Sequence, residues 1–435
     1  MSNNANWLDL LKLRVSYGEA GNNNIPTGQT VQTFVSSTSA WINGFDSFWA
    51  ASKTMANPDL KWETTITRNI GLDYAILGSR LSGSVELYKN NTVDQLILFP
   101  IPGTGYDNQY RNLGEMENKG VEFSVAYAAI EEENYGLSIS ANIAFNRGKI
   151  VSIGNMAYIP GTSGWASTAI GPDYQVKVGQ PLGLMYGYVS DGRYEVSDFE
   201  GYDGTNWITK EGVVKDDGIV RKNRPGVMKL KDLDGDGVIT DRDKKIIGNA
   251  NPKHTGGIVL NGYAYGFDLM ASFNWSFGND VYNANKIEYT TSVPQTPYRN
   301  MLTVMNEANR WTDIDPETGA ITNDPARLQE LNANTTMWSP GMTRYIFSDW
   351  AVEDASFIRL NTLTLGYNVP AALATKLKLR SVRAYATAYN VFVLTNYSGF
   401  DPEVSTRRST PYTPGVDYSA YPRSRQFVFG LNLSF

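Results

Sequence analysis

The residues best suited to hold a metal ion lie in the stretch DLDGDGVITDRD, from Asp232 to Asp243. Its spacing matches a calcium loop of about twelve residues, with aspartates at the first, third and fifth positions and glycine at the sixth, where such loops turn sharply. Further oxygen ligands are expected at the seventh, ninth and twelfth positions. The six candidate ligands are Asp232, Asp234, Asp236, Val238 through its carbonyl, Thr240 and Asp243.

Calcium prefers about six to eight oxygen ligands, and the carboxylates, a carbonyl and water could supply them. Two features count against calcium: Asp243 replaces the longer glutamate of such loops, and no helix pair is predicted beside the loop. The alternative is an Asp- and Gly-rich turn in an external loop, because these residues favour turn geometry. If calcium binds, we expect it to be structural, and the sequence indicates no other cofactor.

The composition excludes most enzymatic chemistry. The chain has 435 residues, no cysteine and a single histidine, His254, which is expected at the start of a strand. Disulfides, thiolate metal sites and cysteine nucleophiles are therefore excluded, and a hydrolase would lack its usual base. The net charge of −6 includes no basic cluster of the kind that nucleic acid requires. We expect a protein that is not an enzyme and binds no nucleic acid.

The elements that position these residues are β-strands. Apolar and polar residues alternate with period two in many windows, which predicts strands with one apolar face. The clearest windows are Leu11–Tyr17, Leu81–Leu87, Leu137–Phe145 and Phe267–Phe277. From Leu8 onward the pattern predicts roughly twelve strands. No segment approaches the ~20 consecutive apolar residues of a membrane-spanning helix.

Short and long connections alternate between the predicted strands, so all the short turns fall on one side. This asymmetry is typical of an outer-membrane β-barrel, with short periplasmic turns and long extracellular loops. A soluble β-sandwich, in which apolar faces meet each other, is the alternative. The short connections are expected near Leu77–Arg80, Glu131–Gly136, Tyr265–Phe267 and Pro370–Arg380, and the long ones at about 21–60, 195–253, 280–350 and 398–424.

Aromatic residues near the predicted strand ends favour the membrane, because their rings are apolar and their tips are polar. The expected interfacial girdle consists of Tyr17, Trp62, Tyr74, Tyr88, Tyr127, Tyr135, Tyr265 and Tyr367. The aromatic loop segments Ile42–Trp49 and Gly161–Ser167 could stack on sugar rings or anchor loops against each other. Asp313, Asp315 and Glu317 are expected in a solvated turn.

Several stretches, in order along almost the whole chain, resemble the SusC/RagA-like branch of the TonB-dependent outer-membrane transporters. They are LRVSYGEAGNNNI (13–25), NPDLKWETT (57–65), GEMENKGVEFSV (114–125), GQPLGLMYGY (179–188), KDLDGDGVITDRDKKIIGNANPKHTGG (231–257), DASFIRLNTLTLGYNVP (354–370), NVFVLTNYSGFDPEV (390–404) and the terminal strand.

The resemblance implies an all-β fold in which residues 1–435 are the C-terminal part of an antiparallel transmembrane β-barrel. That part would hold roughly twelve of the family's about 22 strands. The family's signal peptide, carboxypeptidase-like domain, TonB-contacting segment and plug have no counterpart in these residues. The last strand resembles the signal read by the outer-membrane assembly machinery, carried here by Phe427, Phe429, Leu431, Leu433 and Phe435.

The resemblance also implies a function and a location. We expect a protein of the cell outer membrane, in contact with lipid, that takes up oligosaccharide or peptide. A SusD-like surface lipoprotein would cap the barrel, and TonB would act through the missing N-terminal region. The alternative is a secreted or surface all-β carbohydrate-binding protein. A continuous outward apolar band ~25 Å tall would favour the barrel, and two sheets packed over a dry core would favour the alternative.

Overall fold

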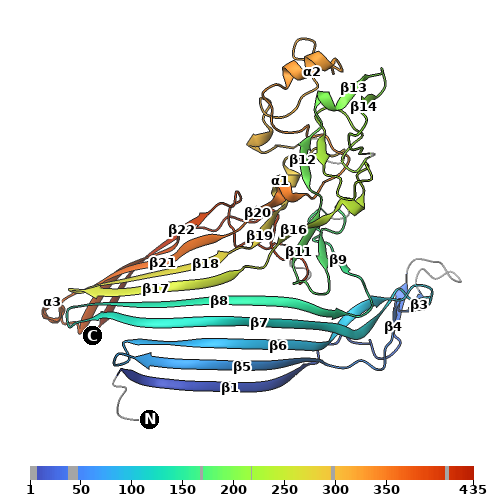
Figure 1. Ribbon diagram of the computed structural model, residues 1–435. Helices are drawn as coiled ribbons and strands as arrows, with labels where there is room; N and C mark the ends of the chain where they lie inside the picture. The colour runs from blue at the N-terminus through green and yellow to red at the C-terminus, as the bar shows by residue number, and fades with distance from the viewer. Residues whose placement is uncertain (1–6, 38–47, 167–169, 217, 295–298, 407–410) are drawn as a thin grey trace.

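The computed structural model describes residues 7–37, 48–166, 170–216, 218–294, 299–406 and 411–435. Its main element is an eleven-stranded sheet in which ten strands pair antiparallel in the order β1-β5-β6-β7-β8-β17-β18-β21-β22-β24, while β4 pairs parallel with β7 (Figure 1). The strands are β1 (Leu8–Asn22), β4 (Thr54–Met55), β5 (Glu63–Ile76), β6 (Leu81–Pro100), β7 (Asn108–Glu131), β8 (Tyr135–Ile153), β17 (His254–Ala264), β18 (Phe267–Phe277), β21 (Phe357–Asn368), β22 (Ser381–Thr395) and β24 (Gln426–Ser434). The predicted all-β antiparallel fold is confirmed, with a strand count close to the expected twelve.

The four predicted short connections are confirmed, and they lie at one end of the sheet together with the start of β1 at Leu8 and the end of β24 at Ser434 (Figure 1). They join β5 to β6, β7 to β8, β17 to β18, and β21 to β22 through α3 (Ala371–Lys376). Between β17 and β18, Tyr265 and Gly266 both have positive φ, 49° and 91°. This is the backbone of the tight hairpin turn whose twist matches that of the flanking strands.

The long connections lie at the opposite end of the sheet. The described residues within 154–253, 278–356 and 396–425 together form a loop domain that rises from the strand ends (Figure 1). Its strands and helices are β9 (Ile159–Gly161), β10 (Tyr174–Val176), β11 (Leu184–Gly187), β12 (Ser190–Arg193), β13 (Phe199–Tyr202), β14 (Trp207–Thr209), β15 (Met228–Leu230), β16 (Lys245–Asn249), β19 (Asp280–Asn283), α1 (Ala284–Glu288), α2 (Pro325–Leu331), β20 (Val352–Asp354) and β23 (Val416–Asp417). The connection from β1 to β5 also carries β2 (Phe34–Ser37) and β3 (Phe48–Ala51). None of the helices in the described segments combines the length and hydropathy needed to cross a membrane.

The loop domain contains the chain's conventional hydrophobic core. One cluster packs around Tyr194, Met228 and Leu230, and another around Met185 and Tyr282. The predicted start of the second long connection, residue 195, is therefore wrong, because that connection begins after Ile153. Strands β10 and β11 lie within this connection and pair with β9 and β16 in a separate four-stranded sheet of the loop domain, where Tyr174, Val176, Leu184 and Met185 are buried.

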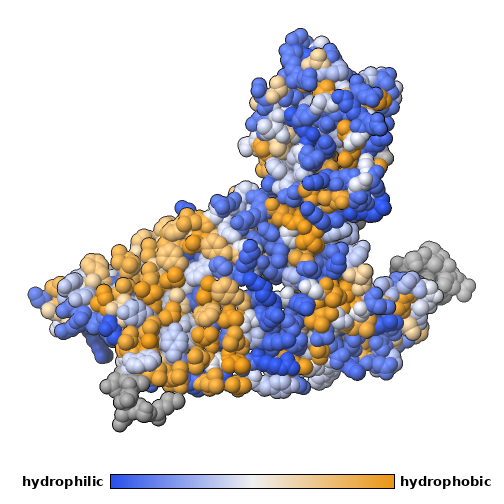
Figure 2. Space-filling view, viewed as in Figure 1, coloured by the Kyte–Doolittle hydropathy of each residue, from blue (hydrophilic) through white to orange (hydrophobic). Residues whose placement is uncertain are grey.

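The main sheet has one apolar and one polar face. On the apolar face, Leu13 lies opposite Leu72, Leu72 opposite Val85, Val85 opposite Phe123, and Phe123 opposite Ile143. The residues between them form the polar face. From Leu137 to Phe145 strand β8 advances about 27 Å at ~3.4 Å per residue, and a tilt of ~40° reduces this to roughly 20 Å of height. Figure 2 shows the resulting hydrophobic surface over the long strands.

Strands β1 and β24 are the two edges of this sheet, and the described residues pair each of them on one side only, with β5 and β22. Their apolar side chains are among the most exposed in the chain: Val15 retains 72% and Phe429 79% of its accessible surface. Each edge therefore presents both a row of backbone hydrogen-bonding groups and an apolar side-chain face.

Candidate functional site

The apolar face of the main sheet exposes hydrophobic side chains on neighbouring strands. Leu13, Leu87 and Phe123 are 67%, 49% and 43% exposed. Their cross-strand neighbours on the same face are also apolar, so these side chains form a continuous exposed hydrophobic surface. Continuous apolar surfaces larger than a few hundred Å² are rare on soluble monomers and mark contacts with membranes or partners. In the described segments no second sheet covers this face, because the loop domain packs beyond the strand ends (Figure 1). The arrangement suits direct contact with hydrocarbon.

Most of the predicted girdle residues are exposed or lie on the apolar face. Tyr74 lies opposite Leu11, and the ring of Tyr367 packs on that of Phe267 with centroids 4.6 Å apart. The prediction for Tyr88 is wrong. Because Leu87 points to the apolar face, Tyr88 points to the polar one, where its hydroxyl donates to Asn146 Oδ1 at 3.0 Å. The exposed members are Tyr17, Trp62, Tyr127, Tyr135 and Tyr265.

The polar face carries charged groups that are paired with one another. The Arg14 guanidinium donates to Asp73 at 2.8 Å and to Glu86 at 2.7 Å, linking three neighbouring strands. Arg383 on β22 makes a similar pair with Asp268 on β18. Charges on this face are therefore stabilised by oppositely charged partners, and a polar interior is the expected character of a transmembrane β-barrel.

One charged group on the polar face is fully buried. Arg359 on β21 is 1% exposed and donates to Asp401 Oδ1 at 2.7 Å, and its Nε lies 2.9 Å from Glu403 Oε2. Arg423 pairs with the same two carboxylates, at 3.1 Å each. This cluster fastens the connection between β22 and β24 onto the sheet. The sequence analysis did not identify it, although the alternation around Arg359 already placed that residue on the polar face.

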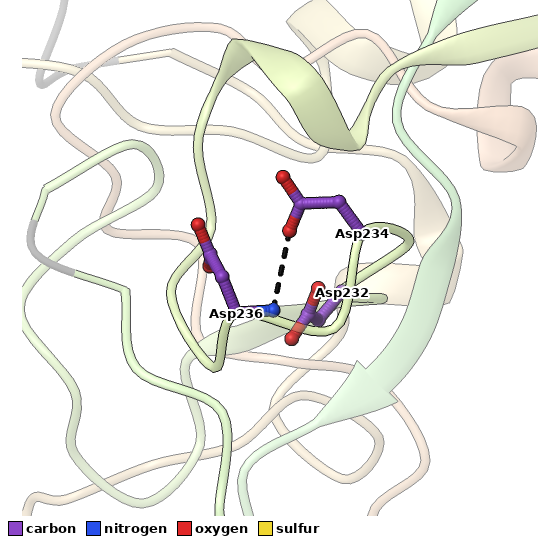
Figure 3. A group of neighbouring side chains, drawn as sticks. All are labelled: Asp232, Asp234 and Asp236. Carbon is purple, nitrogen blue, oxygen red and sulfur yellow. Dashed lines mark hydrogen bonds between the residues drawn. The ribbon is translucent and has the colours of Figure 1, made fainter.

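The aspartate loop brings three of its six predicted ligands together. Carboxylate oxygens of Asp232, Asp234 and Asp236 all lie within 4.8 Å of one another (Figure 3). Oxygens that ligate calcium at 2.3–2.6 Å stand about 3–5 Å apart, so this spacing fits the ion. Asp232 also accepts the backbone N–H groups of Gly235 and Gly237, and these bonds lower the pKa of its carboxyl. The three carboxylates lie in a turn between β15 and β16.

The other three predicted ligands have different contacts. Asp243 is buried and accepts the backbone N–H groups of Leu233 and Thr240, at 2.8 and 2.7 Å. Thr240 caps a short 3-10 turn, and the Val238 amide donates to Asp236. Arg242 reaches over the cluster, with its guanidinium 3.3 Å from Asp234 and 2.5 Å from Asp236. The Arg242 guanidinium thus lies beside two of the carboxylates that would bind a metal ion.

A cleft in the loop domain combines aromatic and amide groups. Phe400 at its rim is 73% exposed, and Lys286 Nζ lies 4.0 Å from the centre of the Trp350 ring. Such a lining can stack on an apolar ring face and bind hydroxyl or amide groups of a ligand. The lining residues include Asn283, Asn285, Lys286, Tyr289, Trp350, Ser398 and Phe400.

The aromatic loop segments divide into two cases. Trp165 is 4% exposed and packs on Tyr282 and Tyr345, so the described part of the segment Gly161–Ser167 anchors loops. In the segment Ile42–Trp49, residues 42–47 lie outside the described residues, and Trp49 is 74% exposed.

The remaining singled-out residues have structural roles. His254 begins β17 as predicted, and its Nδ1 accepts from the Trp275 indole at 3.2 Å. Asp313 pairs with Arg224, while Asp315 and Glu317 pair with Arg327, so this turn is ion-paired as well as solvated.

Comparison with known proteins places this architecture in a family. Residues 2–284 match the family described as TonB dependent receptor-like, beta-barrel. The TonB-dependent receptor P3 of Formosa agariphila is 30% identical over 99% of this chain and 40% of its own length. The TonB-dependent receptor SusC of Bacteroides thetaiotaomicron is 29% identical over 99% of this chain and 38% of its own length. This chain thus spans about two fifths of these relatives.

Among solved structures, the RagAB peptide transporter shares the fold, with a TM-score of 0.72 and 24% identity over 100% of this chain and 42% of the matched chain. The antiparallel sheet with one apolar and one polar face is consistent with a β-barrel wall, and the β-barrel family model matches more than half of the residues. The chain belongs to the TonB-dependent receptor β-barrel family.

Proposed function

We propose that this chain forms part of the wall of an outer-membrane transporter that imports oligosaccharide or peptide with energy delivered through TonB. The family consists of outer-membrane receptors and transporters, not enzymes. The observation that carries the proposal is the two-faced sheet, whose apolar face stays exposed while its polar face holds paired charges. Residues 1–435 would form the C-terminal part of the barrel, and coupling to TonB is proposed as a property of the whole transporter.

The rival function, a secreted carbohydrate-binding protein, requires apolar strand faces that meet in a dry core. Leu13 and Val15 are instead 67% and 72% exposed at the sheet. The two larger buried clusters lie in the loop domain, and a smaller one joins Val176 to the loop-domain ends of β6 and β8. The exposed face therefore favours the transporter.

We propose that a SusD-like surface lipoprotein docks on the loop domain. The long connections lie at one end of the sheet and form a folded body with its own core, which offers a stable platform. The similarity to SusC supports this kind of partner. Cargo would pass beneath that partner, and the cleft around Trp350 and Phe400 is a candidate contact for sugar rings or peptide side chains.

Two further roles are proposed for sites predicted from the sequence. The terminal strand β24 would be read by the outer-membrane assembly machinery through Phe427, Phe429, Leu431, Leu433 and Phe435, whose side chains are exposed along one face. The aspartate loop would hold a structural calcium ion that replaces the Arg242 guanidinium between Asp234 and Asp236. Calcium would then fix the connection between β15 and β16.

Growth experiments test the uptake function directly. The gene for the longest natural protein that contains this chain is deleted, and growth is measured on single oligosaccharides and on peptides as sole nutrients. The proposal expects growth to be lost on one nutrient class, and the same loss when TonB is removed. Normal growth of both strains on every nutrient of both classes would contradict it.

A further inference from the structure

Four basic residues form a row across four neighbouring strands. Arg68 on β5 lies opposite Lys89 on β6, Lys89 opposite Lys119 on β7, and Lys119 opposite Arg147 on β8. They are up to 79 positions apart in sequence, and only the strand register brings them together. At ~4.8 Å between strands, the row spans about 14 Å.

The row lies on the apolar face, because the residues two positions away on each strand are Ile70, Leu87, Val121 and Phe145. These four apolar residues form the adjoining row on the side of the short turns. Both rows line one groove, with cations along its loop-domain side and hydrocarbon side chains below. Figure 2 shows the hydrophobic surface of the strands bordered by a hydrophilic zone toward the loop domain.

The charge of this region is strongly positive. The next row toward the loops adds Lys149 and Glu117, with Glu19 at the edge. These two rows of the apolar face therefore contain five basic side chains and two carboxylates. Glu117 lies 2.8 Å from Lys89 and 3.6 Å from Lys119, whose side chains are still 50% and 63% exposed. A surplus of three positive charges therefore remains at the border of the apolar band.

The arginines at the two ends of the row, Arg68 and Arg147, are held in place by neutral acceptors. Arg147 donates to the carbonyls of Asn146 and Lys253, at 2.7 and 2.9 Å. Arg68 donates to Asn91 Oδ1 at 3.2 Å. None of these three bonds is to a carboxylate, so both arginines keep their charge for an external anion.

We propose that this groove binds the phosphorylated headgroup of an anionic lipid in the outer leaflet, with the acyl chains lying along Leu87, Val121 and Phe145. Arg and Lys bind phosphate through charge-assisted hydrogen bonds, and a row about 14 Å long suits a headgroup with more than one phosphate. The apolar row below it suits lipid chains and no soluble anion. The inference rests on the proposed membrane orientation, in which the loop domain lies outside the cell.

Native mass spectrometry of the natural protein in detergent tests this site. Diphosphoryl lipid A, monophosphoryl lipid A and phosphatidylethanolamine are added in turn, and the retained lipid is counted. We expect diphosphoryl lipid A to be retained most and phosphatidylethanolamine least. The Lys89→Gln/Lys119→Gln variant should lose about tenfold in retention of diphosphoryl lipid A, because two charge-assisted bonds are removed.

Two matched variants control the experiment. Lys376→Gln/Lys378→Gln removes two exposed lysines in and next to α3, at the short-turn end, and should retain diphosphoryl lipid A as the parent does. Lys89→Arg/Lys119→Arg should also retain it, which separates loss of charge from misfolding. Equal retention of all three lipids by the parent, or displacement of the lipid by millimolar pyrophosphate, would overturn the site.

The outcome is separable from that of the proposed function. Insertion into liposomes is measured on the same preparations by protease protection. Insertion without lipid preference rejects the lipid site and leaves the transporter standing. Failure of the natural protein to insert would reject the membrane orientation itself.

Discussion

Arg359 and Asp401 lie 2.7 Å apart, in β21 and in the connection that follows β22. Both are nearly inaccessible to solvent, at 1% and 7% exposure. Their pairing fixes a long connection against the polar face, where the interior of the barrel is expected. The loop domain is thus held to the sheet by a buried charge cluster as well as by the backbone.

Replacing Arg359 by Leu should destabilise the fold strongly. Asp401 and Glu403 would then share one cation, Arg423, and breaking a buried pair on one side costs about 3–5 kcal/mol. Denaturant unfolding in detergent measures this loss. The partly exposed pair of Arg383 and Asp268 is the control, and Arg383→Leu should cost only about 1 kcal/mol. Equal losses for the two variants would show that burial of Arg359 is not decisive.

Asp173 in the loop domain should make stability fall between about pH 4 and pH 6. Burial raises the pKa of this carboxyl from 3.8 to about 6, although the Ser163 amide and hydroxyl donate to it. The folded state therefore binds the proton more tightly than the unfolded state. The contribution is fully favourable below pH 4 and is lost as the pH rises through 6, by about 3 kcal/mol.

The measurement for Asp173 compares thermal unfolding of the parent and Asp173→Asn across this pH range, followed by near-ultraviolet circular dichroism. The parent should lose stability relative to Asp173→Asn as the pH rises. Asp203→Asn is the control of opposite sign, because N–H groups of Asn206 and Thr205 lower the pKa of Asp203. A constant difference between parent and Asp173→Asn would contradict the prediction.

Calcium should raise the unfolding temperature of the parent but not of Asp234→Asn. At a concentration one hundred times the dissociation constant the ion would add about 2.7 kcal/mol. Arg242→Gln should bind calcium more tightly, because it removes the guanidinium that competes for Asp234 and Asp236. Asp203→Asn, in another acidic turn of the loop domain, should respond as the parent does. No shift in the parent would remove the calcium proposal.

Charge on the two faces of β24 should have unequal effects. Phe429 lies on the apolar face opposite Ala386, and Asn432 on the polar face opposite Arg383. Phe429→Lys should cost about 2–4 kcal/mol in a bilayer, whereas Asn432→Lys should cost less than about 1 kcal/mol. Heat-modifiable migration of the folded protein on gels checks both. Equal folding yields would argue against lipid contact at this edge.

The strands and their short turns could be predicted because side-chain alternation is a local property. His254 and the four short connections were correctly placed for that reason. The start of the second long connection, after Ile153, was not, because β9, β10 and β11 form a separate sheet with β16 in the loop domain, and which sheet a strand joins is not a local property.

Contacts between distant segments could not be predicted from spacing. The row from Arg68 to Arg147 depends on the register of three strand pairs, and Arg359 meets Asp401 across 42 positions. One local signal was available for the row, since each of its residues lies two positions from an apolar outward residue. The aspartate loop differs, because Asp232, Asp234 and Asp236 are close in sequence and their carboxylates lie together in the structure. Asp243 instead accepts the backbone N–H groups of Leu233 and Thr240. Calcium binding at this loop stays a prediction.

The central claim is that hydrocarbon covers the apolar face. Single cysteines can be placed along β8 at residues 138–143 in the natural protein, after any cysteine that it carries beyond the cysteine-free residues 1–435 is replaced by serine. The variants are then spin-labelled and reconstituted into liposomes. The labels at 139, 141 and 143 should be accessible to oxygen, which concentrates in lipid, and those at 138, 140 and 142 to a water-soluble nickel chelate. Labels at 139, 141 and 143 that are shielded from both reagents, or reached mainly by the chelate, would contradict the account.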